Sequence, residues 1–91
     1  MRYVRTAAFQ RSYEALGRVR QTRVDRALLQ LEALYVHRQR QFGLGLKSLK
    51  PGIWEIRAGV DDRILFRWTG DCVELLIAGN HDEIRRVLKQ L

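Results

Sequence analysis

The sequence contains one cysteine, Cys72, and no apolar run long enough to cross a membrane. A single cysteine excludes a disulfide within the chain and a zinc site built on cysteine ligands. The N-terminal residues MRYVRTAAF lack the apolar segment of a secretory signal. The length of 91 residues fits one domain, and we expect a single cytoplasmic domain over residues 1–91.

Motifs of the common catalytic classes are missing as well. There is no G-x-S-x-G, no phosphate-binding P-loop, no H-E-x-x-H and no Cys/His spacing suited to a metal. We therefore expect neither a metal nor a cofactor. Any chemistry must then rest on ordinary side chains.

Negative charge is scarce. Ten Asp and Glu residues face seventeen Lys and Arg residues, which gives a net charge of +7, and arginine outnumbers lysine. The planar guanidinium group can form paired hydrogen bonds to phosphate or carboxylate. This excess favours nucleic acid, a ribosome or an acidic protein as a partner. The alternative is a basic, soluble surface that has no polyanionic ligand.

Helical spacing of apolar residues dominates the first half of the chain. The residues RYVRT alternate and predict a short strand, after which Thr6 can cap a helix that ends at Gly17. Thr22 and Asp25 resemble a capping box, and a second helix is expected from about Thr22 to Arg40. The segment RVRQ between the helices is expected to be a turn. The two helices should form a hairpin.

Strand patterns dominate the second half. The stretch FGLGLKSLKPG, which holds the only proline, predicts a loop. The runs GIWEIRA, DRILFRW and CVELLIA are separated by short turns and predict an antiparallel meander of three strands. The chain closes with an amphipathic helix whose apolar face carries Ile84, Val87, Leu88 and Leu91. The expected fold class is α+β, with an N-terminal strand, a helical hairpin packed on the sheet and a short C-terminal helix.

Alternation along the strands assigns side chains to the two faces of the sheet. The face expected to be apolar and to pack on the helices carries Trp54, Ile56, Ile64, Phe66, Trp68, Val73, Leu75 and Ile77. The face expected to be charged carries Glu55, Arg57, Arg63, Arg67 and Glu74. A slip of one residue would bury these charges, so the register is well specified. Pairing of the three arginines with the two glutamates is the structural alternative to a role in binding.

The segment GNHDEIRR is the best candidate for chemistry. Asn80 and Glu83 have the spacing of a capping box, which places His81 at the first helical position. The positive end of the helix dipole disfavours an imidazolium there, so we expect a neutral imidazole that can accept a proton. Arg85 lies one turn on, and a phosphate would meet backbone N–H groups, an imidazole and a guanidinium. The alternative is a solvent-exposed histidine without a task.

One possible base among many cations is the set that a metal-free ribonuclease requires. Such an enzyme needs a base for the ribose 2′-OH, cations for the charge on the phosphorane and an acid for the 5′-oxygen. A passive polyanion binder would carry the same residue types.

The order of elements and several motifs resemble the RelE/ParE superfamily of bacterial toxins. The most specific motifs are LKPGIWEIR, the following DRILFR and the closing AGNHDEI, and the likeness covers nearly the whole chain. For the RelE branch, the resemblance implies cleavage of mRNA in the ribosomal A site, by attack of the mRNA's own 2′-OH and without a metal. It also implies a cognate antitoxin, which we expect to be acidic and partly disordered.

The resemblance suggests roles for individual residues. Lys47 and Lys50 match loop cations near the mRNA and the ribosomal RNA. Arg57 matches the strand arginine that holds the scissile phosphate, and Arg63 matches an arginine that is as much structural as catalytic. His81 sits where the YafQ-like branch carries a catalytic histidine.

Arg85 departs from the family pattern. Many active members carry Tyr or Phe there, which can stack on a base or, for tyrosine, take part in proton transfer. Arginine cannot act as a base at neutral pH, although it can hold a phosphate or stack on a base. Either His81 carries the proton chemistry, or the activity is weak, or the target differs.

We therefore predict a ribosome-dependent mRNA endonuclease toxin whose partners are an antitoxin and mRNA on the 70S ribosome. The predicted catalytic residues are His81, Arg57 and Arg85, and the predicted RNA-binding residues are Lys47, Lys50, Arg63 and Arg67. One alternative is a ParE-type toxin that inhibits DNA gyrase by binding it, because a shared fold hosts different functions. The other is an inactive relative that binds only RNA or an antitoxin.

Overall fold

A five-stranded sheet with helices on both faces forms the protein. The computed structural model describes the whole chain, residues 1–91. The elements are β1 (Arg2–Arg5), α1 (Ala7–Ala15), α2 (Arg18–Val36), β2 (Lys47–Lys50), β3 (Ile53–Arg57), β4 (Asp62–Thr69), β5 (Cys72–Asn80) and α3 (His81–Leu88). The strand order is β1-β5-β4-β3-β2, with β1 parallel to β5 and the other neighbours antiparallel. The α+β class and the meander β3–β4–β5 are confirmed.

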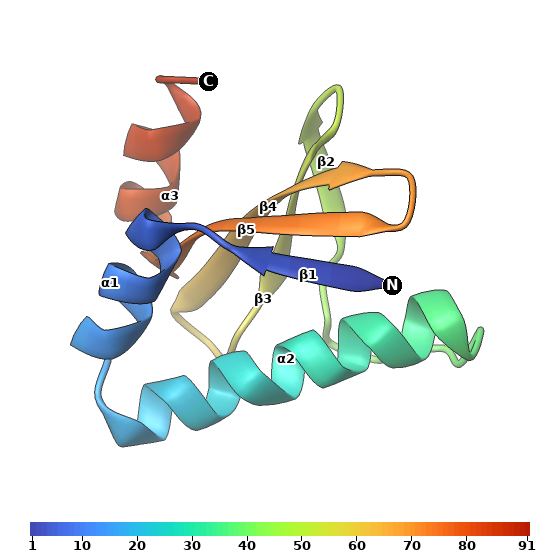
Figure 1. Cartoon of the computed structure of the whole chain (residues 1–91). Helices are drawn as coiled ribbons and strands as arrows, with labels where there is room; N and C mark the ends of the chain where they lie inside the picture. Colours follow the sequence, from blue (N-terminus) through green and yellow to red (C-terminus); the bar gives the residue numbers. More distant parts are fainter.

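The three helices divide between the two faces of the sheet (Figure 1). Helices α1 and α2 pack on one face, and the short α3 packs on the other. None of the helices has the length and apolar character that crossing a membrane requires.

The predicted start of the second helix at Thr22 is wrong. Helix α2 begins at Arg18, directly after Gly17, whose φ of +81° allows a sharp turn out of α1. The Thr22 hydroxyl donates to the Arg18 carbonyl at 3.0 Å, so Thr22 bonds to the preceding helical turn and caps nothing. The segment RVRQ is therefore the first turn of the helix. The helix also ends at Val36 and not at Arg40.

The prediction of one continuous loop before β3 is also wrong, because that segment contains a strand. β2 pairs antiparallel with β3 from Lys47 to Lys50, with an irregularity between Ser48 and Lys50. Its apolar residue Leu49 packs against the cluster beneath α3. Pro51 follows the strand and donates no hydrogen bond, which an edge position tolerates. The glycines and the proline thus mark the ends of a short edge strand.

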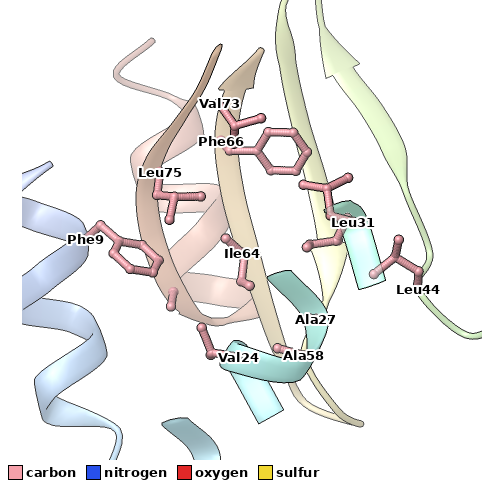
Figure 2. Close-up of a cluster of buried hydrophobic side chains, with 12 residues drawn as sticks. Phe9, Val24, Ala27, Leu31, Leu44, Ala58, Ile64, Phe66, Val73 and Leu75 are labelled. Carbon is pink, nitrogen blue, oxygen red and sulfur yellow. The ribbon is translucent and has the colours of Figure 1, made fainter. Parts of the chain in front are cut away.

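The main core fills the space between the sheet and helices α1 and α2 (Figure 2). Phe9 of α1 and Leu31 of α2 meet Phe66 and Leu75 of the central strands, and all four side chains are fully buried. The predicted apolar face of β3 and β4 is confirmed, since Trp54, Ile56, Ile64, Phe66 and Trp68 all belong to this core or pack against it. Removal of this apolar surface from water is the main source of folding free energy.

The second face is partly apolar because β5 does not keep one alternation. A β-bulge at Leu76 shifts the pairing with β4. Beyond the bulge the alternation reverses, and Ile77 packs against the smaller cluster formed by Ile53, Leu65 and Ile84 of α3. The predictions that Ile77 faces the main core and that all helices share one face are therefore wrong. The apolar face of α3 is confirmed for Ile84, Val87 and Leu88, whereas Leu91 is 44% exposed.

Candidate functional site

Three of the candidate residues, Arg57, Arg63 and His81, lie at one end of the sheet, where β3 and β5 end and α3 begins. In the register of the sheet, Arg57 of β3 lies opposite Arg63 of β4, and Arg63 lies opposite Gly79 of β5. Adjacent strands lie about 4.8 Å apart, so the backbones of Arg57 and Gly79 are roughly 10 Å apart. His81 follows closely, as the first residue of α3. The fold therefore brings Arg57 and His81 to the same end of the sheet.

The predicted capping box at the start of α3 is confirmed. The Glu83 amide donates to Asn80 Oδ1 at 2.9 Å, and the Asn80 amide donates to Glu83 Oε1 at 3.1 Å. A Cβ at position 79 would lie 2.8 Å from Glu83 Oε1, so Gly79 leaves the carboxylate the room it needs. These contacts fix the direction in which α3 leaves β5, and with it the position of His81.

Replacing Asn80 with alanine is expected to lower the free energy of unfolding by about 1 kcal/mol, because the Glu83 amide loses its acceptor. Chemical denaturation of both proteins measures the difference. Asn80→Ser is the matched control, since a serine oxygen accepts the same hydrogen bond and should retain most of the stability. Equal losses in the two variants would show that the cap contributes nothing.

His81 lines an open cleft of about 590 Å³ between α2, the β3–β4 turn and α3. The lining residues are all polar: Arg20, Arg23, Asp61, Asp62, Asn80, His81 and Asp82. Charges of both signs therefore surround the imidazole, so the electrostatic potential at His81 depends on these side chains as well as on the helix dipole. The His81 side chain is exposed and accessible to a ligand. No group of three or more His, Cys, Asp or Glu side chains is arranged to hold a metal ion.

This cleft contains an ion pair between Arg20 and Asp62 that was not predicted from the sequence. Arg20 donates from Nε and Nη2 to the two carboxylate oxygens of Asp62, at 2.8 and 2.7 Å. The Asp62 side chain is only 4% exposed, and hydrogen bonding to it raises the pKa of Arg20. The available signal was the position of Asp62, which shares the inward face of β4 with Ile64. A carboxylate at an inward position requires a cation, and here α2 supplies it.

Arg57 lines a second open cleft, which meets the first at Arg23. This cleft also contains Arg26 of α2 and has a volume of about 470 Å³. Arg57 takes part in none of the ion pairs of the protein. Its guanidinium is therefore available to a ligand. His81 and Arg57 line neighbouring clefts and do not share one pocket.

Arg63 and Arg67, both predicted to bind RNA, are engaged in cross-strand pairs. Arg67 donates to Glu74 at 2.7 Å, and Arg63 Nε lies 3.9 Å from a Glu55 oxygen. The Arg63 and Glu55 side chains are also largely buried, at 20% and 14% exposure. Both arginines thus have a glutamate neighbour, as the structural alternative describes, and their role in RNA binding stays a prediction.

The two lysines of β2 differ in their surroundings. Lys50 donates from Nζ to the Leu88 carbonyl at 3.1 Å, at the C-terminal end of α3. A cation at that end of a helix is stabilised by the helix dipole, so Lys50 ties β2 to α3. Lys47 is exposed and lies opposite Glu55 in the register of β2 and β3.

Arg85 is exposed in the last turn of α3, four residues after His81. This spacing places both side chains on one side of the helix. Arg85 forms no ion pair and lines neither cleft. The structure therefore associates Arg85 with His81 but does not bring it to Arg57.

Comparison with known proteins finds similarity in structure only. No protein-family model and no curated protein matches the chain. A copper-bound mutant toxin from Helicobacter pylori is 16% identical, with a TM-score of 0.72 over 92% of this chain and 98% of that one. A chain of the RelB-RelE antitoxin-toxin complex from Methanococcus jannaschii is 16% identical, with a TM-score of 0.67 over 92% of this chain and 96% of that one.

A third solved structure, YafQ from E. coli, is 13% identical and has a TM-score of 0.62 over 92% of this chain and 98% of that one. All three matches extend over nearly the full length of both chains. The chain therefore shares its fold with these three solved structures.

Proposed function

We propose that this chain is the toxin of a toxin–antitoxin system and that it cleaves mRNA on the ribosome without a metal. The observation that carries the proposal is the position of His81. It lies at the capped start of α3 and at the same end of the sheet as Arg57, which forms no ion pair. The fold supports the toxin role, because the solved structures with this fold include toxins.

The proposed reaction is an internal transesterification of RNA. The ribose 2′-oxygen forms a bond to the adjacent phosphorus, the bond from phosphorus to the 5′-oxygen breaks, and the products are a 2′,3′-cyclic phosphate and a free 5′-OH. His81 accepts the proton of the 2′-OH, which is a task for a neutral imidazole within reach of the ribose. The same ring, once protonated, can return a proton to the leaving 5′-oxygen.

Cations near His81 would stabilise the phosphorane. Arg57 donates to the non-bridging oxygens from the end of β3, and Arg85 supplies a second guanidinium from the His81 side of α3. Lys47 is exposed, is not bonded to α3 as Lys50 is, and would contact the RNA backbone. Lys50, Arg63 and Arg67 would act mainly by holding α3 and the sheet in place, since each is bonded within the protein.

A cognate antitoxin is part of the proposal. The net charge of +7 favours an acidic, partly disordered chain that folds as it covers the basic surface. The RelB-RelE complex from Methanococcus jannaschii is an antitoxin–toxin pair with this fold on its toxin chain. Co-expression with such a partner would be expected to restore growth.

Induction of the chain in a bacterial host tests the function. Primer extension is mapped on a translated message and on a copy without a start codon. We expect cuts inside the codons of the translated copy and none in the other, because the ribosome positions the message. Arrested growth with intact messages and accumulating DNA breaks would instead indicate a gyrase inhibitor. Normal growth with soluble protein and no cuts would indicate an inactive relative.

A further inference from the structure

The second cleft, here called the arginine cleft, lies where the β3–β4 turn approaches the middle of α2 (Figure 1). Its lining residues are Arg23, Arg26, Ala27, Gln30, Phe42, Gly43, Arg57, Gly59 and Val60. The volume of about 470 Å³ lies in the range of pockets that bind small ligands or parts of larger ones.

Three guanidinium groups line this cleft and no carboxylate does. Neither Arg23, Arg26 nor Arg57 forms an ion pair. Other arginines behave differently, since Arg20 of α2 is paired with Asp62 and Arg67 of β4 with Glu74. Arg23 also lines the first cleft, which contains carboxylates, whereas Arg26 and Arg57 line this one only. Positive charges that lie together repel one another, and a bound anion would relieve that repulsion.

Two glycines allow the backbone to approach the stems of these arginines. A Cβ at Gly45, where φ is +64°, would lie 2.9 Å from Arg57 Cγ, and a Cβ at Gly59, where φ is +98°, would lie 2.9 Å from Arg23 Cδ. Only glycine combines these φ values with such close approach. Gly45 and Gly59 therefore let the loops pass close to the stems of Arg57 and Arg23, two of the arginines that line the cleft.

Two exposed apolar side chains form the rims of the cleft. Phe42 is 81% exposed and Val60 is 88% exposed, the highest values among the large apolar residues of the protein. Arg40 lies over the Phe42 ring, with its Cζ 5.4 Å from the ring centroid. Proteins that bind single-stranded nucleic acids combine such features, because bases stack on an exposed aromatic ring and arginines bind the phosphates.

We propose that the arginine cleft binds one nucleotide of a single-stranded RNA next to the cleavage point. Arg23 and Arg26 hold its phosphate, and its base stacks on Phe42. The inference rests on the proposed function and extends it, because it adds α2 and the segment before β2 to the RNA-contacting surface. An acidic peptide would use the arginines but would leave the solvent-exposed surface of the Phe42 ring uncovered.

Binding is measured by fluorescence anisotropy with a labelled, single-stranded 2′-O-methyl RNA of roughly eight nucleotides, which has no 2′-OH to react. Arg26→Gln is expected to raise Kd roughly tenfold and to reduce the salt dependence of log Kd by about 0.7. Phe42→Leu is expected to raise Kd roughly 5- to 100-fold through lost stacking. Arg11→Gln is the matched control, because Arg11 is exposed on α1, has no ion pair and carries the same charge.

If Arg26→Gln and Arg11→Gln weaken RNA binding equally, the proposal is overturned, because the binding would then depend on the overall positive charge of the protein and not on the cleft. Unchanged binding by Phe42→Leu would remove the stacking role. Tighter, Arg26-dependent binding of poly-glutamate would identify the cleft as a site for a protein. The assay contains no ribosome and no cleavable bond, so it is independent of the nuclease test. If the message is cut on the ribosome but RNA binding does not depend on Arg26, only the proposed role of the cleft is wrong. If RNA binding depends on Arg26 but no message is cut, only the proposed nuclease activity is wrong.

Discussion

Replacing His81 with glutamine is expected to slow cleavage of ribosome-bound mRNA by roughly 100- to 10,000-fold, because the reaction loses its general base. Glutamine is tolerated at the start of a helix and leaves the Asn80–Glu83 capping box intact. The loss should therefore appear in the rate and not in the stability. Single-turnover cleavage with excess enzyme on programmed ribosomes measures the rate, and thermal unfolding checks the fold.

The chain offers a matched control for this experiment. His37 is the only other histidine and is exposed at the C-terminal cap of α2, away from both clefts. His37→Gln makes the same chemical change and should leave the rate unaltered. Rates that are alike for the native chain and His81→Gln would remove His81 from the chemistry, even if the protein proved to be a nuclease.

Replacing Arg20 with methionine is expected to lower the free energy of unfolding by about 3 kcal/mol, since it leaves the buried Asp62 carboxylate without a partner. Asp62 opens β4 and pairs in register with Asn80, so the same change should loosen the start of α3. The melting temperature should fall by roughly 10–20 °C for a domain of this size. Chemical and thermal unfolding at neutral pH measure both quantities.

Two further variants separate the ion pair from a general effect of charge. Arg18→Met removes a cation from the same helix at an exposed position without an ion pair, and should change stability little. The double change Arg20→Met with Asp62→Leu should recover most of the loss, because no buried charge remains. Equal destabilisation by Arg18→Met and Arg20→Met would contradict the role of the Arg20–Asp62 pair.

Parts of the candidate site could be predicted from sequence because short-range contacts build them. Thr6 caps α1 by accepting from the Phe9 amide, and Asn80 caps α3 as its spacing with Glu83 predicted. These contacts involve residues three apart in the chain, so the sequence specifies them directly. The position of His81 at the first helical residue follows from them.

Which cations are free to bind a ligand could not be predicted in this way. Three strand arginines look alike in the sequence, yet Arg63 and Arg67 face glutamates and Arg57 does not. The cations beside Arg57 come from α2, far away in the chain, and approach it only once the β3–β4 turn has packed against that helix. Charge patterns along single strands carry no information about that neighbour.

The sequence by itself determined the α+β class, the order of the elements other than β2, the caps of α1 and α3, and the apolar faces of β3 and β4. All of these follow from periodicity and from interactions within a few residues. Tertiary structure decided the face on which α3 packs, because one extra residue at Leu76 reverses the alternation of β5. It also decided the pairing of Lys50 with α3 and of Arg20 with Asp62. Such contacts join residues distant in the chain, and only the packed sheet and helices bring them within hydrogen-bonding distance.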